Sequence, residues 1–154
     1  MNKALVIIFA VLMSFGLSAQ QASIPAYWDC SGTPPSGFST NTNPIEYYVS
    51  SNYYVSAPSA LKLAGDDEYL EIELNAKPGQ VDFWLGGTGS GPWEGTFEIR
   101  ESNNGSSWNT LRTFVDGDIS TNSVDSFAVQ PAGTTRFIRF YYTDKVSGHN
   151  MAVD

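Results

Sequence analysis

The sequence predicts an all-β protein built as one antiparallel β-sandwich, and three observations carry this prediction. Short apolar runs recur from residue 45 onward and are separated by clusters of turn-forming residues, a spacing typical of sandwiches. The 154 residues include 14 Gly and 8 Pro, while 16% are charged and 14% are aromatic. This composition suits a turn-rich β protein with a hydrophobic core. No segment shows a clear helical period.

Alternation of apolar and polar residues places the individual strands. In EYLEIEL, the apolar side chains of Leu70, Ile72 and Leu74 share one face, and Glu71 and Glu73 share the other. We expect strands over Glu46–Val49, Tyr53–Val55, Ala60–Leu63, Tyr69–Leu74, Val81–Leu85, Thr96–Glu101, Asn109–Phe114, Asp125–Val129 and Thr135–Thr143, and a last one from Met151.

Two of these strands carry aromatic residues on the face that is turned away from the core. In TRFIRFYY, Ile138 and its alternate neighbours face one way, so Arg139 and Tyr141 face the other. In VDFWL, Trp84 alternates with core-type residues and is expected on the outer face.

The chain divides into three parts. Residues 1–19 read as a secretory signal peptide, with Lys3 followed by an apolar run that is too short and too interrupted to span a membrane. Residues 20–44 are expected to be an irregular wrapping segment centred on SGTPPSG. Residues 45–154 form the sandwich module, which we expect to be truncated at MAVD, in the middle of an apolar strand. The lone Cys30 is expected to be buried.

The charge balance limits the partners. With 16 acidic and 8 basic side chains the formal net charge is −8, so phosphate backbones and anionic membranes repel the chain. We therefore expect no nucleic-acid partner and no membrane insertion after signal cleavage. The acidic surplus either supplies oxygen ligands for calcium or keeps an exported protein soluble.

Five sequence pieces, in order, resemble a known kind of module. They are PPSGFST, SAPSALKL, VDFWLGG, FEIRESNNGSSWNTLRTF and TRFIRFYYTDKVSGHNMAVD, which together run from Pro34 to Asp154. They resemble the jelly-roll modules, related to galactose-binding-like and adhesin sandwiches, at the front of proteins exported by the type IX secretion route. The resemblance implies a jelly-roll sandwich and a final strand that ends in paired acids, of which this chain has Asp154 alone. It implies no particular activity, because such modules precede many different enzymes and adhesins.

Catalytic chemistry has little support in the sequence. The sole histidine, His149, stands in the turn SGHN without a nucleophile motif and is expected to be a surface residue. Glu71 and Glu73 share a strand face, and two carboxylates placed in this way could serve glycoside hydrolysis. Alternating acids are, however, ordinary on a solvent-exposed strand face, which is the favoured interpretation. We expect this segment not to be an enzyme.

Calcium is the one cofactor for which the sequence offers ligands, and no cofactor is certain. Asp66 and Asp67 crowd one turn, and Asp154 lies where the resembling modules often place an acid near an ion. The sequence has no EF-hand loop spacing, so the ordinary preference of turns for acidic residues is the favoured explanation of the same acids.

Carbohydrate binding needs aromatic faces with polar groups beside them. Trp93, in the glycine-rich loop GGTGSGPWEG, is the expected platform, with Trp84, Tyr141 and Arg139 as companions. The alternative is that these aromatics pack against the N-terminal segment. Trp108, after a glycine turn, is expected in the core.

The sequence thus predicts a secreted or cell-surface protein whose module has a non-catalytic binding or adhesion function. The expected ligand is a polysaccharide or a cell-surface glycan. Downstream domains of the same chain are the other expected partners. The alternative is a structural spacer that precedes a secreted peptidase, nuclease or glycosidase.

Overall fold

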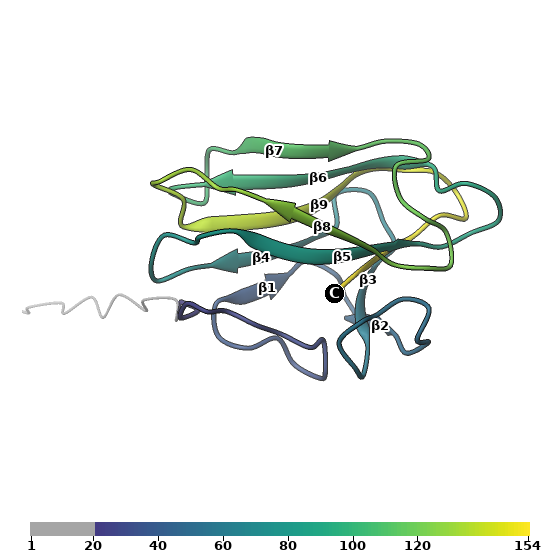
Figure 1. The fold of residues 1–154 in the computed structure, drawn as a ribbon, viewed down its shortest axis with the longest axis horizontal. Helices are drawn as coiled ribbons and strands as arrows, with labels where there is room; N and C mark the ends of the chain where they lie inside the picture. The colour runs from purple at the N-terminus through teal and green to yellow at the C-terminus, as the bar shows by residue number, and fades with distance from the viewer. Residues whose placement is uncertain (1–20) are drawn as a thin grey trace, which may run out of the picture.

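Residues 21–154, described here from a computed structural model, form two five-stranded antiparallel sheets that pack face to face (Figure 1). The first sheet has the order β1-β4-β9-β6-β7 and the second the order β2-β3-β10-β5-β8. The strands are β1 (Phe38–Thr40), β2 (Glu46–Tyr48), β3 (Ala60–Leu63), β4 (Tyr69–Glu73), β5 (Val81–Gly87), β6 (Gly95–Ser102), β7 (Asn109–Phe114), β8 (Asp125–Val129), β9 (Phe137–Lys145) and β10 (Met151–Val153).

The connectivity confirms the jelly-roll-like sandwich. Strands β3 to β10 follow the order of a jelly roll, crossing between the sheets at every connection except the hairpin from β6 to β7, and β1 and β2 each extend one edge. No helix among residues 21–154 has the length and apolarity to cross a membrane. The predicted signal peptide, residues 1–19, lies outside the described residues.

Two local predictions were wrong. The segment Tyr53–Val55 is not a strand: it turns back so that the Tyr53 ring lies 4.6 Å from that of Tyr48 and its hydroxyl donates to Asn122. The N-terminal segment is not wholly irregular either. Its β1 pairs with β4, because the backbone edge of β4 would otherwise be open.

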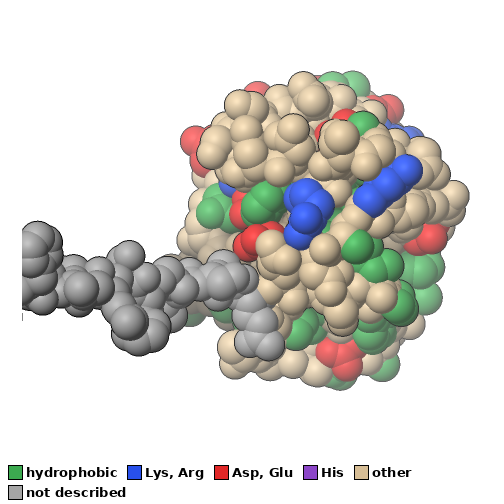
Figure 2. All heavy atoms as spheres, turned by 90° about the vertical axis from the view of Figure 1, so that its left-hand side faces the viewer, with side chains coloured by type: hydrophobic (Ala, Val, Ile, Leu, Met, Phe, Trp, Pro, Cys, Tyr) green, Lys and Arg blue, Asp and Glu red, His purple; other side chains and the backbone are tan. Residues whose placement is uncertain are grey.

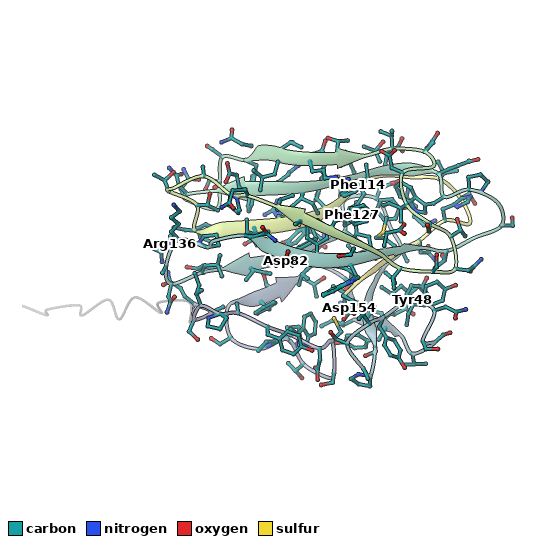
Figure 3. All side chains as sticks on the ribbon, in the orientation of Figure 1. Tyr48, Asp82, Phe114, Phe127, Arg136 and Asp154 are labelled. Carbon is teal, nitrogen blue, oxygen red and sulfur yellow. The ribbon has the colours of Figure 1, made fainter. Side chains whose placement is uncertain are left out.

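The core lies between the sheets and is rich in aromatic rings. Phe83 of β5 meets Phe140 of β9 edge-on, with centroids 5.1 Å apart. At the β7 and β8 edge, the Phe114 and Phe127 rings are 4.7 Å apart and point toward each other (Figure 3). Cys30 is 3% exposed within this core, as expected, and its thiol is free.

Burial of Cys30 gives a prediction about alkaline pH. Loss of solvent around the thiol raises its pKa to about 12 from an ordinary value near 9. The folded state therefore holds the proton more tightly than the unfolded state. Its contribution to stability is complete below pH 9 and is lost as the pH rises from 9 toward 12. Urea unfolding at pH 7 and pH 10 should show lower stability at pH 10, and this pH dependence should shrink in Cys30→Ala; an unchanged dependence would contradict the assignment.

At the end of the sandwich that lies on the left of Figure 1, basic, acidic and hydrophobic side chains are mixed, and no one type forms a broad patch. Figure 2 shows a few basic side chains there among acidic and hydrophobic ones. Arg136, at this end in Figure 3, is engaged in the structure: its Nε donates to the carbonyl of Leu74 at 2.7 Å and its Nη2 to Gln21 at 3.1 Å. It ties the N-terminal segment to the start of β9.

Candidate functional site

The outer face of the first sheet gathers aromatic, arginine and glutamate side chains. Alternation produces this face: Leu70, Ile138 and Phe140 point into the core, so their neighbours along β4 and β9 point outward. The register then joins them, with Tyr69 opposite Tyr141 and Arg100 opposite Arg139. We call this surface the aromatic-arginine face; its residues, all partly buried, are Tyr69, Glu71, Glu98, Arg100, Trp108, Phe137, Arg139 and Tyr141.

Arg139 stands at the centre of the aromatic-arginine face. Its guanidinium carbon lies 4.4 Å from the centroid of the Tyr69 ring and 4.0 Å from that of Trp108. Its Nε donates to Glu71 Oε2 at 2.9 Å. Side-chain exposure of 18% for both Arg139 and Glu71 reduces solvent screening of this ion pair. The pair and the two rings hold the guanidinium in one orientation.

A second arginine repeats the arrangement one strand away. The guanidinium carbon of Arg100 lies 4.1 Å from the centroid of the Tyr141 ring, and its Nε donates to Glu98. The Tyr141 hydroxyl donates to Asp67, and this hydrogen bond raises the pKa of Tyr141. Arg139 with its two rings and Arg100 with its one ring therefore lie side by side across β4, β9 and β6, and each guanidinium is already held by a neighbouring carboxylate.

The predicted platform residues do not come together. Tyr141 and Arg139 do share the aromatic-arginine face. Trp84 lies on the other sheet, half-buried, and its backbone exchanges two hydrogen bonds with Asp154. The two sheets separate Trp84 from the other two residues, so one ligand surface cannot include all of them.

Trp93 corrects the expectation of an exposed loop platform. Its side chain is 0% exposed, and its ring lies 6.0 Å from that of Tyr142 in the core. The surrounding glycines leave space for the buried indole, and they do not serve to bend the loop toward a ligand. A Cβ on Gly87 would lie 2.7 Å from the Trp93 ring, and Gly95 has a φ of +140° that other residues rarely adopt.

Sequence reasoning missed four members of the aromatic-arginine face: Tyr69, Glu98, Arg100 and Trp108. Trp108 was expected in the core, but it is only half-buried, and its ring meets that of Phe137 at 6.4 Å. The alternation in GTFEIRES carried a signal for Arg100, because Ile99 faces inward. Nothing local showed that Tyr69 would lie opposite Tyr141.

The acids proposed for calcium lie in two places. Asp66 and Asp67 follow β3, where Asp66 accepts the backbone N–H of Lys145 at 2.6 Å. Asp154 follows β10 and accepts the N–H groups of Val55 and Ser56 at 2.6 and 2.8 Å. Among residues 21–154, no three His, Cys, Asp or Glu side chains gather as a metal site would require. Calcium binding stays a prediction without a defined site.

The structure also places the other two candidates for chemistry. His149 was expected on the surface, but it is 7% exposed and packs close to Gly89, whose added Cβ would lie 2.7 Å from Nδ1. Glu71 is paired with Arg139, and Glu73 accepts a hydrogen bond from Gln21 at 2.8 Å.

Comparison with solved structures shows where this fold recurs. An adhesin domain of Lys-gingipain superposes with a TM-score of 0.59 at 10% identity, covering 78% of this chain and 87% of that one. A second Lys-gingipain adhesin domain, from Porphyromonas gingivalis, gives 0.58 at 15% identity, covering 78% and 90%. The module TmCBM61, solved in complex with β-1,4-galactotriose, gives 0.50 at 16% identity, covering 76% and 82%.

These similarities establish the fold class: the chain has the β-sandwich fold that is found in adhesin domains and in a carbohydrate-binding module. Identities this low carry the fold alone. No family model matches the sequence, and no curated protein matches it.

Proposed function

We propose that the protein is a non-catalytic module that binds carbohydrate, and that the glycan lies across the aromatic-arginine face. The observation that carries this proposal is the ordered stack of Tyr69, Arg139 and Trp108 beside that of Arg100 and Tyr141. The shared fold with adhesin domains and with TmCBM61 supports a binding role.

The residue types fit the chemistry of sugars. Pyranose rings present apolar C–H faces, which stack on aromatic rings, and hydroxyl groups, which pair with charged side chains. Because Arg139 and Arg100 are already held by Glu71 and Glu98, little side-chain entropy is lost when a ligand binds. The acidic side chains then accept hydrogen bonds from hydroxyls while the guanidinium groups donate them.

The main test is a matched pair of tryptophan variants. Trp108→Ala removes a ring from the aromatic-arginine face and should weaken glycan binding about fivefold to tenfold, since a stacked ring contributes about 1 kcal/mol or somewhat more. Trp84→Ala is the control, because Trp84 is also half-buried but lies on the opposite sheet. Affinity electrophoresis against soluble polysaccharides, followed by calorimetry on those that bind, measures both.

The contrary outcomes are distinct. Equal weakening by both variants, or weakening by Trp84→Ala alone, would move the site away from the aromatic-arginine face. If a broad set of soluble and insoluble polysaccharides shows no binding by the unaltered protein, the glycan function fails and the spacer role becomes the better account.

The setting of the module is also a proposal. We propose that it is secreted or held at the cell surface, that it reaches there by the type IX route, and that it works beside downstream domains of the same polypeptide. The route is supported by the resemblance of PPSGFST and the four later sequence pieces to modules of proteins exported in this way. The location is supported by the adhesin domains that share the fold.

A further inference from the structure

A polar hollow of about 250 Å³ opens at one end of the sandwich. It lies between the end of β6, the start of β7 and the loop that leads from β8 into β9, which come together on the left of Figure 1. At about 30 Å³ for each water, the hollow has room for about eight waters, or for a single sugar ring. Seven of its eight lining residues are polar: Glu101, Ser102, Asn103, Ser107, Asn109, Thr134 and Thr135, with Ala132 as the eighth.

The hollow has a buried floor and an exposed rim. Glu101, Ser102 and Thr135 form the floor and are all buried, and the other lining residues are exposed. The floor is held in place by the β6–β7 hairpin, because Ser102 Oγ accepts the backbone N–H groups of Asn104 at 3.1 Å and Gly105 at 2.9 Å. A ligand that enters from the rim therefore meets polar groups that are already positioned.

The carboxylate of Glu101 uses only one of its two oxygens. Oε2 accepts the backbone N–H of Ala132 at 2.7 Å and the hydroxyl of Thr135. Oε1 makes no hydrogen bond within residues 21–154, and it is not one of the fully enclosed atoms that lack a partner. Oε1 is therefore an accessible acceptor at a residue that is 8% exposed.

No cation neutralises this buried carboxylate. In the described part of the chain, the ion pairs join other residues, and Glu101 belongs to none of them. The guanidinium of the nearby Arg136 donates to Leu74 and Gln21 instead. Lys77 comes near the loop at Gly133, but it does not line the hollow. Because a buried charge without a counter-ion is costly, a cationic ligand at Oε1 would gain more than a neutral one.

We propose that this hollow is a binding site for an amino sugar, with the ammonium group of a hexosamine donating to Glu101 Oε1. A protonated amine next to a carboxylate makes a charge-assisted hydrogen bond, which is stronger than a neutral one. The hydroxyl groups of the same sugar ring can pair with the amide and hydroxyl side chains of the rim. The size of the hollow limits the ligand to one sugar unit, either free or at the end of a glycan.

Two other cations fit the hollow less well. A lysine side chain carries a long apolar stem, and Ala132 is the one apolar residue in the lining that could pack against it. Calcium takes about six to eight oxygen ligands, usually including several carboxylates, and Glu101 is the one carboxylate in the lining. The observations therefore favour an ammonium group on a polyhydroxylated ring.

The amino-sugar site is separate from the aromatic-arginine face. Along β6, Ile99 and Glu101 point between the sheets, whereas Arg100 points outward. This inference therefore does not rest on the proposed glycan site, and the two can fail independently.

The test compares sugars that differ at one group. At pH 6 a primary amine is protonated, and NMR titration of the amide signals measures affinity and location together. Glucosamine should bind about tenfold or more tightly than glucose and should shift the amides of Ala132 and Gly133. N-acetylglucosamine, which has lost the charge, should bind no better than glucose. Lysine amide should bind more weakly than glucosamine.

Two sets of variants check the role of charge. Glu101→Gln should reduce glucosamine binding to the level of glucose, whereas Glu46→Gln, which removes an exposed carboxylate from the other sheet, should leave it unchanged. Asn103 is exposed on the rim, so its variants should fold normally. Asn103→Asp should tighten glucosamine binding about twofold to fivefold, and Asn103→Lys should weaken it by a similar factor.

Several results would overturn the proposal: no binding of glucosamine, equal binding of glucosamine and glucose, tighter binding of lysine amide, or shifts confined to the aromatic-arginine face. Retained affinity in a folded Glu101→Gln protein would also overturn it. If Glu101→Gln does not fold, the two Asn103 variants decide, and equal affinities for glucosamine would count against the site. Loss of polysaccharide binding in Trp108→Ala bears on the aromatic-arginine face alone.

Discussion

Trp93→Ala is expected to destabilise the protein by about 3–5 kcal/mol, the usual cost of removing a buried indole. Trp93 is fully buried and packs against Tyr142, so truncation leaves a large cavity between β5 and β6. Urea unfolding with a tryptophan-independent probe, such as far-UV circular dichroism, measures the change. Trp108→Ala is the control and should cost clearly less, because Trp108 is only half-buried.

The glycine beside Trp93 makes this prediction sharper. Gly87→Ala should destabilise the unaltered protein by about 1–3 kcal/mol, because the new methyl group would overlap the indole. In the Trp93→Ala background that cost should largely disappear, and the double-mutant cycle should show strong coupling. A Trp93→Ala protein that unfolds like the unaltered one but fails to bind glycan would instead restore Trp93 as an exposed platform.

The strands could be predicted from the sequence because each carries its pattern locally. Leu70 and Ile72 in β4, or Ile138 and Phe140 in β9, alternate with polar residues whatever the partners are. Strand β1 has only three residues, and it exists because the edge of β4 is available. Its pairing depends on the tertiary contact with β4, which the local sequence pattern does not reveal.

The candidate site could be predicted in part, for a similar reason. Alternation in TRFIRFYY placed Arg139 and Tyr141 outward, and the structure agrees. Trp93 was misplaced because a glycine-rich loop permits either exposure or close packing, and only the contact with Gly87 decides between them. Tyr69 joined the face through the β4 and β9 register, which depends on residues about seventy positions apart.

Glu101→Ala is expected to be the second most destabilising change, at about 2–4 kcal/mol, because it removes two hydrogen bonds and leaves the buried Thr135 hydroxyl without its acceptor. Glu101 is 8% exposed at the end of β6. Its Oε2 accepts the backbone N–H of Ala132 at 2.7 Å and the hydroxyl of Thr135, which is itself 1% exposed. The carboxylate thereby fixes the loop that leads into β9.

The amide variant separates hydrogen bonding from simple packing. Glu101→Gln keeps an oxygen that accepts both bonds and loses only the charge, so it should cost less than Glu101→Ala, about 1–2 kcal/mol. Glu98→Ala, on the same strand but facing outward and partly exposed, is the matched control and should cost less than about 1 kcal/mol. Urea unfolding at pH 7 ranks the three. If Glu101→Ala unfolds no more easily than Glu98→Ala, the Glu101 carboxylate does not hold the loop, and β9 must be positioned by its ladders with β4 and β6 alone.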